Sequence, residues 1–294
     1  MKSSMIKPVP SLILCALLWS TGGFLIKLVD WNPVAIAGIR SLIGGITICF
    51  ILKRPLVFRV CSGSGCIDKT ATFNLWAGAV CYALTMILFV IATKLTTAAN
   101  AVFLQYTNPI WVILFGPALT GEKNRTSDYF AVTGVMAGML LFFSGGLSGG
   151  TFTGNIIAAV SGITYGFSSI FLRRQKDANP VDSFTLSYLI TCIISIPFWF
   201  IKPHFSLQSV VCLLLLGTIQ IGLPSILYAI GIAKVRALSA VLISLLEPLM
   251  NPVWVLLAVH EVPSAGTIAG GAIILGSIVI RAVVQNLRPA EKDI

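Results

Sequence analysis

The sequence predicts an all-α membrane protein, with ten transmembrane helices arranged as two inverted five-helix repeats. Of 294 residues, 56% are hydrophobic and 10% are charged, whereas roughly a quarter of an ordinary soluble domain is charged. Apolar runs of membrane-spanning length recur along the whole chain. A proline motif also occurs twice, as Asn108-Pro109 followed by Glu122 and as Glu247-Pro248 followed by Glu261.

Ten windows have the length of a transmembrane helix, because about 20 apolar residues cross ~30 Å of hydrocarbon. Their apolar runs are continuous and do not alternate, which favours helices over a barrel. In chain order the windows are Val9–Ile26, Pro33–Leu52, Leu75–Thr93, Ala98–Leu119, Tyr129–Leu147, Gly154–Leu172, Phe184–Ile201, Leu207–Ala233, Leu238–Val259 and Gly266–Ile280.

The ten spans divide into two repeats, residues 1–148 and residues 149–294. The proline motif keeps a step of 13 residues from Pro to Glu in both, and the copies are offset by 139 residues. Because five spans per repeat is an odd number, the second repeat must cross the membrane in the opposite direction. Asn32-Pro33 and Asn179-Pro180 are expected to open the second helix of each repeat.

Positive charge is distributed unevenly across the predicted membrane. Of the 20 Lys and Arg residues, sixteen fall on one side and only Lys27, Lys94 and Lys202 on the other, so the positive-inside rule places both termini in the cytoplasm. We expect a multi-pass protein of the bacterial inner (plasma) membrane, with the lipid bilayer as its surroundings. The basic residues occupy short loops and form no continuous surface for a phosphate backbone, which argues against nucleic-acid binding.

The sequence indicates no metal, no cofactor and no catalytic site. Most of the seven cysteines lie within spans, where they pack as small hydrophobic residues. Cys61 and Cys66 share a Ser/Gly-rich loop, but zinc usually takes four ligands and no further Cys or His is near in sequence. Matches to nucleophile and phosphate-loop motifs lack the structural context that they need. The chain is therefore not expected to be an enzyme.

Prolines inside two spans mark a candidate binding site near the membrane midplane. Proline lacks an amide hydrogen, so Pro109 leaves the carbonyl of Gln105 without its helical partner, and Pro248 does the same for Ser244. Such carbonyls at bilayer depth need a cavity, water or another chain. The polar side chains on these faces are Gln105, Asn108, Ser244, Glu247 and Asn251. Alternatively, the prolines only kink the helices and the polar groups bond neighbouring helices.

Aromatic side chains inside the spans are candidates for the walls of this site. They are Trp19, Tyr82, Phe89, Tyr165 and Tyr228. Near Tyr228, Pro224 frees the carbonyl of Gln220 in the same way as the other prolines. Apolar walls with a few placed polar groups are typical of small-molecule sites, although ordinary packing also explains each aromatic residue taken alone.

Arg40 and Glu247 are the two charged residues predicted inside spans, where each costs about 2.5–3.5 kcal/mol on insertion scales. Arg40 is close enough to Pro33 at the helix start to snorkel ~10 Å outward; otherwise it pairs with a charge or binds a substrate carboxylate. Glu247 is too deep and too short to snorkel. It is our candidate for coupling transport to protons, with direct binding of a substrate ammonium group as the alternative.

Four short motifs carry a family resemblance, and they are Trp19-Ser-Thr-Gly22, Pro33 followed by Arg40, Pro109…Gly121-Glu122, and Glu247-Pro248…Glu261. With the ten-helix count, the chain resembles two EamA-type repeats of the drug/metabolite transporter superfamily. The resemblance implies a secondary carrier that alternates between inward-open and outward-open states, around a cavity lined mainly by helices 1, 3, 4, 6, 8 and 9. The second repeat has Val259-His260 before its Glu, which departs from the family's usual Gly-Glu.

We therefore expect a carrier, proton-linked or uniport, for a small polar or amphipathic metabolite. Export of an amino-acid-like compound is the first hypothesis, and import of such a compound or of a vitamin is the second. A proton or other ion gradient is the candidate energy source. A membrane-embedded enzyme would have to use His204, His260 and Glu261, which are scattered, and a receptor does not need two inverted halves. Gly-x-x-x-Gly pairs indicate close helix packing without deciding the oligomeric state.

Overall fold

A computed structural model describes residues 7–61, 67–144, 151–201, 206–250, 253 and 264–287. These residues form helices and no β-strand, apart from an isolated bridge between Cys61 and Ile67. Within them, nine helical stretches are long and apolar enough to cross a membrane, and a shorter apolar helix covers Ala237–Met250. The predicted all-α, multi-pass architecture is confirmed.

The first repeat forms seven helices, two pairs of which share a span. They are α1 (Pro8–Trp19), α2 (Gly22–Leu28), α3 (Pro33–Leu52), α4 (Lys69–Leu95), α5 (Ala98–Gln105), α6 (Asn108–Thr120) and α7 (Thr126–Phe143). The break between α5 and α6 is the one that Pro109 predicts. The break at Ser20 and Thr21, between α1 and α2, was not predicted, because no proline marks it.

The second repeat is interrupted in two places, which are the eighth and ninth spans of the chain. Its elements are α8 (Phe152–Arg174), α9 (Pro180–Ser195), the 3₁₀ helix η1 (Ile196–Phe198), α10 (Leu207–Leu215), η2 (Leu216–Gly222), α11 (Leu223–Ile232), α12 (Ala237–Ser244) and α14 (Ala265–Leu287). η2 is a π-helical segment within the eighth span, and residues 246–250 continue the helix after α12. The repeat boundary between residues 148 and 149 falls outside the described residues and stays a prediction.

Local sequence explains where several helices begin and end. Asn32 and Asn179 cap α3 and α9, since their side-chain oxygens accept hydrogen bonds from the amides of Val34 at 2.9 Å and Val181 at 3.3 Å. The proline that follows each cap needs no amide partner in the first turn. Both Asn-Pro pairs thus open the helices that the sequence predicts. α6 ends at Gly121, whose φ of 75° is a left-handed conformation that glycine adopts readily.

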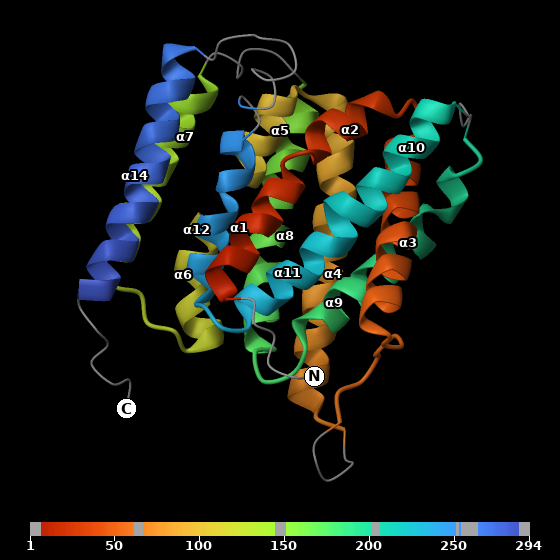
Figure 1. Cartoon of the computed structure of the whole chain (residues 1–294), viewed down its shortest axis with the longest axis horizontal. Helices are drawn as coiled ribbons and strands as arrows, with labels where there is room; N and C mark the ends of the chain where they lie inside the picture. Colours follow the sequence, from red (N-terminus) through yellow and green to blue (C-terminus); the bar gives the residue numbers. More distant parts are fainter. Residues whose placement is uncertain are drawn as a thin grey trace.

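The two repeats run in opposite directions (Figure 1). The start of α1 and the end of α14 lie at one end of the molecule, whereas α8 starts at the opposite end. The α6–α7, α8–α9 and α11–α12 connections share the end with the start of α1. We call it the basic end, because these connections and the adjoining helix ends carry Lys123, Arg125, Arg173, Lys176 and Arg236.

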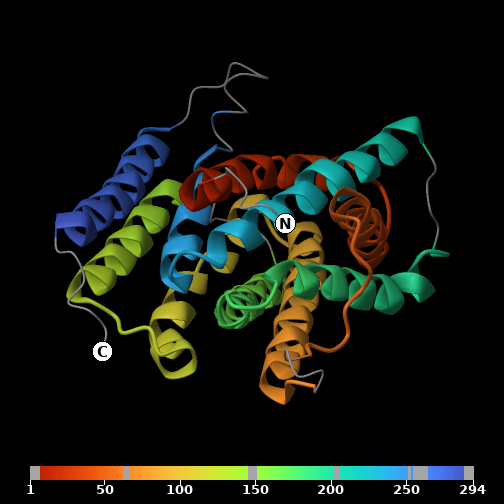
Figure 2. The same cartoon turned by 60° about the horizontal axis from the view of Figure 1, so that its bottom comes forward.

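Helices from both repeats interleave at the centre of the molecule. α4 packs against α8 and α9, and α3 packs against α9 and η2. α7 and α14 pack mainly against each other and form a pair at one side (Figure 2). Glycines permit this close pairing, because a Cβ added at Gly138 would lie 2.9 Å from the carbonyl oxygen of Gly270. The predicted Gly-x-x-x-Gly contacts are therefore made here within one chain.

Candidate functional site

The breaks in the fourth and ninth spans meet at the centre of the molecule. Pro248 leaves the carbonyl of Ser244 without a helical amide partner, and the hydroxyl of Tyr106 lies 3.3 Å from that carbonyl oxygen. The same hydroxyl hydrogen-bonds to the carboxylate of Glu247. Tyr106 itself lies in the break between α5 and α6 and is 1% exposed. One side chain thus joins the interruptions of the two repeats.

The carbonyls freed in the fourth span face a helix instead of the cavity. The carbonyl of Leu104 accepts a hydrogen bond from the Thr107 hydroxyl at 2.7 Å. A Cβ added at Gly162 of α8 would lie 2.6 Å from the carbonyl oxygen of Leu104 and 2.8 Å from that of Gln105. Gly162 therefore lets α8 lie directly against the break. These carbonyls therefore face a helix of the same chain, which is not one of the surroundings named from the sequence (a cavity, water or another chain).

A small cavity of about 30 Å³ lies beside the Tyr106–Glu247 contact. Its lining comes from both repeats and consists of Trp19, Arg40, Tyr82, Thr85, Met86, Phe89, Gln105, Tyr165, Gln220, Ile221 and Glu247. Most of these residues were proposed from the sequence as site residues, and they are far apart in the chain. In this conformation the cavity has room for about two water molecules.

Arg40 is held at the cavity wall and does not snorkel. The side chain is 1% exposed, and its Nη1 and Nη2 atoms lie 3.3 Å from Oε1 of Gln220 and 3.4 Å from Sδ of Met86. Its Nε has no hydrogen-bond partner in the part of the chain that the structure describes. The snorkelling interpretation is therefore wrong, because α3 directs this side chain into the protein.

Arg40 and Glu247 line the same cavity but do not form an ion pair. The four ion pairs between described residues involve other arginines, namely Arg54, Arg173, Arg236 and Arg281. Glu247 bonds to Tyr106, and Arg40 bonds to the neutral Gln220 and Met86. The cavity therefore presents a cation and a carboxyl group that lie beyond ion-pair distance of each other.

The π-helical segment places Gln220 between Arg40 and the end of α1. Nε2 of Gln220 donates to the carbonyl of Trp19 at 3.4 Å, and its Oε1 accepts from Arg40. A π segment widens the helix locally, and such segments are frequent at functional sites. α11 begins immediately after this segment, with Pro224 in its first turn. The sequence predicted a freed carbonyl at Gln220, whereas the structure also brings the side chain into the site.

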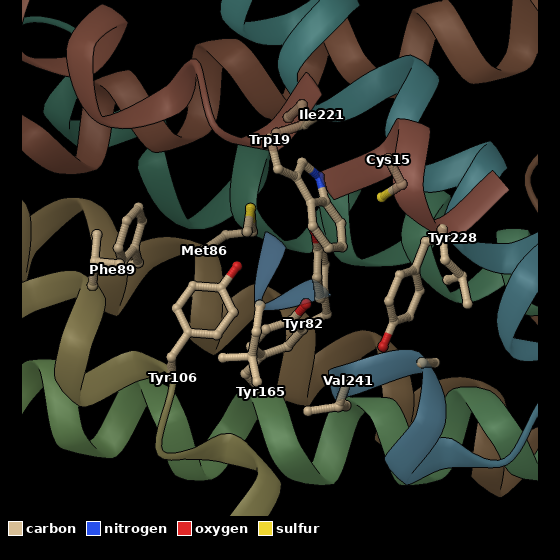
Figure 3. Packing of buried hydrophobic residues seen from close by; sticks show 14 of the residues in the cluster. Cys15, Trp19, Tyr82, Met86, Phe89, Tyr106, Tyr165, Ile221, Tyr228 and Val241 are labelled. Carbon is tan, nitrogen blue, oxygen red and sulfur yellow. The ribbon is translucent and has the colours of Figure 1, made fainter. Parts of the chain in front are cut away.

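Aromatic rings from different helices converge beside the cavity (Figure 3). Trp19 packs against Tyr228 with a centroid distance of 5.2 Å and against Tyr165 at 6.3 Å. Tyr106 lies edge-on to Tyr165 at 6.4 Å. The Tyr228 hydroxyl lies 3.1 Å from the Ser169 hydroxyl, and this contact fixes the ring that packs against Trp19. Aromatic pairs at these distances hold one another in place.

Several predicted residues lie away from the cavity. Asn108 is 0% exposed, and its amide has no hydrogen-bond partner among the described residues. The Ser244 hydroxyl donates to the carbonyl of Ala240 at 3.0 Å, and Tyr228 lies behind Trp19. Asn251 is outside the described residues. The helical periodicity behind these predictions fails where the helices are broken.

Four functional candidates were missed from the sequence. They are Tyr106, Thr85, Met86 and Ile221. Tyr106 stands between Gln105 and Asn108, so its position in the interrupted segment was a usable signal. Thr85, Met86 and Ile221 give no such signal, because small hydroxyl and apolar residues are common throughout membrane helices. No group of three or more potential metal-binding side chains occurs within the described ranges.

Ion pairs tie the two repeats together at the basic end. The buried carboxylate of Asp128 accepts from Nε of Arg281 at 2.7 Å and lies 3.0 Å from Nη2 of Arg236. Glu122 accepts from Nε of Arg173 at 2.6 Å and from the amide of Ala237 at 3.2 Å. Arg173 also donates to the carbonyl of Ala233 at 2.7 Å. These contacts connect α6 and α7 with α8, α12 and α14.

A duplicated helical fold with interrupted spans around a central cavity is typical of membrane carriers. Comparison with known proteins agrees with this class. The model of the EamA-like transporter family matches residues 7–144 and 152–282. The chain belongs to this family, whose members transport small molecules across membranes.

Two further proteins are similar along nearly the whole chain. The uncharacterized transporter YwfM of Bacillus subtilis (strain 168) is 26% identical over an alignment of 294 positions that covers 95% of each protein. A solved crystal structure superposes with a TM-score of 0.77 over 96% of this chain and 99% of its own, at 19% identity. That likeness concerns the fold. The family and the transporter relative support a transporter and not an enzyme.

Proposed function

We propose that the protein is a secondary carrier of zwitterionic, amino-acid-like compounds with apolar side chains. The proposal depends on one observation. Arg40 and Glu247 line the same cavity but form no ion pair with each other. A buried guanidinium without a counter-charge costs several kcal/mol, and a ligand carboxylate offsets that cost. Glu247 offers the opposite charge to an ammonium group, and the aromatic wall offers apolar contact.

The size of the cavity supports alternating access. At about 30 Å³ it is far below the roughly 300–1,000 Å³ of small-molecule sites, so a metabolite enters only after the surrounding helices move apart. The lining comes from broken or π-distorted spans as well as straight ones. Rocking of one inverted repeat against the other is the motion that such folds use, and short helical pieces joined at breaks adjust to it readily.

Orientation in the membrane is the second part of the proposal. The uneven distribution of Lys and Arg supports a cytoplasmic basic end, both termini in the cytoplasm and residence in a bacterial inner membrane. Cys61 is exposed in the loop that follows α3. With all other cysteines replaced by serine or alanine, Cys61 should react with an impermeant maleimide in inverted vesicles and not in intact cells. Labelling of intact cells would overturn the orientation.

Matched ligands test the substrate class. Purified protein is titrated with phenylalanine, with phenethylamine, which lacks the carboxylate, and with 3-phenylpropionate, which lacks the amino group; leucine and its two analogues form a second set. We expect thermal stabilisation by a zwitterion and at least about tenfold weaker binding of its two analogues, since each leaves one buried charge without a partner. Equal binding of a zwitterion and its amine would overturn the role of Arg40.

The direction of transport is tested with membranes of both orientations. An exporter accumulates substrate in inverted vesicles under an imposed gradient, whereas an importer accumulates it in intact cells. Export is our first hypothesis and import is the alternative. Accumulation only in intact cells would overturn export in favour of import and would leave the proposed binding site unchanged.

Coupling to protons is assigned to Glu247. The Tyr106 hydroxyl and the cavity are its immediate surroundings, and a buried carboxyl group can take up a proton from one side and release it to the other. Glu247→Gln should therefore abolish gradient-driven transport in liposomes, whereas binding of a zwitterion should be weakened by the lost ammonium contact but should remain measurable. Asp30→Asn is the control, because it removes an exposed carboxylate outside the cavity. This variant should transport normally. Complete loss of binding in Glu247→Gln at every pH would make Glu247 only the partner of the substrate ammonium and would overturn its role in proton coupling.

A further inference from the structure

A second, much larger cavity opens at the basic end. This cleft of about 1180 Å³ lies between the α7–α14 pair and the ends of α6, α8 and α12. Its lining contains the cations Lys123, Arg125, Arg173, Lys176, Arg236 and Arg281, against one acidic residue, Glu122. None of these residues lines the central cavity. The basic cleft is therefore a separate feature of the molecule.

Only part of this charge is neutralised by the protein. Asp128 pairs with Arg236 and Arg281, and Glu122 pairs with Arg173. Lys123 and Lys176 are exposed, and neither has a carboxylate within ion-pair distance in the described part of the chain. Hydroxyl groups of Thr126, Ser127 and Ser277 add uncharged donors to the lining. Phosphate oxygens accept hydrogen bonds from cationic side chains and from hydroxyl groups of this kind.

The deeper wall of the cleft is apolar. Phe130 and Ile280, on the membrane-spanning helices α7 and α14, are 75% and 65% exposed and line it, together with Val284. Phe130 lies one turn from Thr126, or ~6 Å further into the membrane along α7. The cleft thus combines cations at the helix ends with hydrocarbon one turn deeper. A soluble phosphate compound would contact only the cations and not the apolar wall.

We propose that the basic cleft binds an anionic phospholipid from the leaflet at this end of the protein. Lys123 and Lys176 hold the headgroup phosphate, and the acyl chains lie along Phe130, Ile280 and Val284. Basic pockets between transmembrane helices bind anionic lipid headgroups, and each Lys or Arg near the surface contributes about 1 kcal/mol. The lipid bridges the α7–α14 pair and the end of α8, to which Lys176 is adjacent.

Thermal unfolding of the full-length, delipidated protein tests this site. The probes are phosphatidylglycerol, phosphatidylethanolamine with the same acyl chains, and glycerol 3-phosphate. We expect phosphatidylglycerol to raise the unfolding temperature by about 4 °C or more at saturation, and the other two probes to have little effect. An equal effect of phosphatidylethanolamine would overturn charge recognition. An equal effect of glycerol 3-phosphate would assign the cleft to a soluble phosphate compound and overturn the lipid proposal.

Paired variants locate the effect. Lys123→Gln with Lys176→Gln should weaken phosphatidylglycerol binding about tenfold or more, without changing the unfolding temperature in the absence of lipid. The matched control, Arg59→Gln with Lys69→Gln, removes two exposed charges outside the cleft and should keep the full response. An equal loss in both double variants would show non-specific attraction and overturn the site. An undiminished response of the Lys123/Lys176 variant would overturn it as well.

Discussion

Among the described residues, two arginines are buried within the membrane-spanning helices, and their surroundings differ. Arg281 of α14 is 6% exposed, and its Nε donates to Asp128, which is 0% exposed, at 2.7 Å. Arg40 of α3 is 1% exposed, and the hydrogen-bond partners of its guanidinium group among the described residues are the neutral groups of Gln220 and Met86. The chain supplies a hydrogen-bonded counter-charge in one case, whereas in the other Glu247 lines the same cavity but lies beyond ion-pair distance.

This difference separates a charge that holds the fold together from a charge that is available to a ligand. Removing one partner of a buried pair leaves the other charge uncompensated, which costs about 3–5 kcal/mol. Removing a buried charge that has no partner relieves a desolvation penalty instead. The two arginines should therefore respond in opposite ways to the same substitution.

The largest effect is expected from Arg281→Gln. The change leaves Asp128 buried with Arg236, Gln285 and the amide of Arg125 as its remaining partners, and should lower the free energy of unfolding by about 3 kcal/mol. The measurement is thermal or denaturant unfolding in detergent. Arg54→Gln is the matched control, because Arg54 is 42% exposed and lies 3.8 Å from Asp182; it should cost at most about 1 kcal/mol.

A second substitution checks the cause of that loss. Asp128→Asn in the Arg281→Gln background removes the buried carboxylate that has lost its more buried arginine partner, and should restore part of the stability, as a positive coupling in a double-mutant cycle. If Arg281→Gln unfolds at the wild-type temperature, the ion pair between Arg281 and Asp128 does not stabilise the packing of α14 against α7, and the contrast between the arginines disappears.

The next effect in size is expected from Arg40→Gln. Its stability should equal or exceed that of the wild type, since Arg40 forms no ion pair and Glu247 keeps its hydrogen bond to Tyr106. Its affinity for a zwitterionic substrate should fall about 30-fold, which corresponds to about 2 kcal/mol. Thermal unfolding and ligand titration of the same preparation measure both quantities. Unchanged affinity with reduced stability would make Arg40 a structural residue and remove the basis of the proposed substrate class.

The sequence predicts the fold well because membrane insertion imposes strong constraints. Ten apolar windows anticipate the spans, and Pro109 and Pro248 anticipate two of the interruptions. The break after Trp19 and the π-helical turn of η2 were not anticipated. No proline marks the break after Trp19. Pro224 indicates a freed carbonyl at Gln220, inside η2, but the π-helical form depends on how the surrounding helices pack, and a single sequence does not contain that information.

The candidate site is predicted less completely for a related reason. Gln105 and Glu247 reach the cavity as expected, whereas Asn108 and Ser244 do not. The prediction assumed one continuous helical face through each proline, but the chain changes direction at each break. Tyr106 was missed because an aromatic residue in an apolar span looks like packing until its partner, far along the chain, is known.

The smallest expected effect concerns the support of Arg40 by Gln220. A Cβ added at Gly22 would lie 2.6 Å from Nε2 of Gln220, whereas one added at Gly23 meets nothing within 4 Å. Gly22→Ala should displace Gln220 from Arg40 and the carbonyl of Trp19, and weaken substrate binding about fivefold, equivalent to about 1 kcal/mol.

Gly23→Ala is the matched control for this prediction. Both glycines lie in α2, so both alanines stabilise the helix by a similar amount, about 0.5–1 kcal/mol. Only Gly22→Ala should change affinity, because only its methyl group reaches Gln220. Ligand titration of the two variants isolates the contact from the helix effect. Equal affinities would mean that Gln220 adjusts without moving Arg40, and that the guanidinium is positioned by the α3 backbone and Met86 alone.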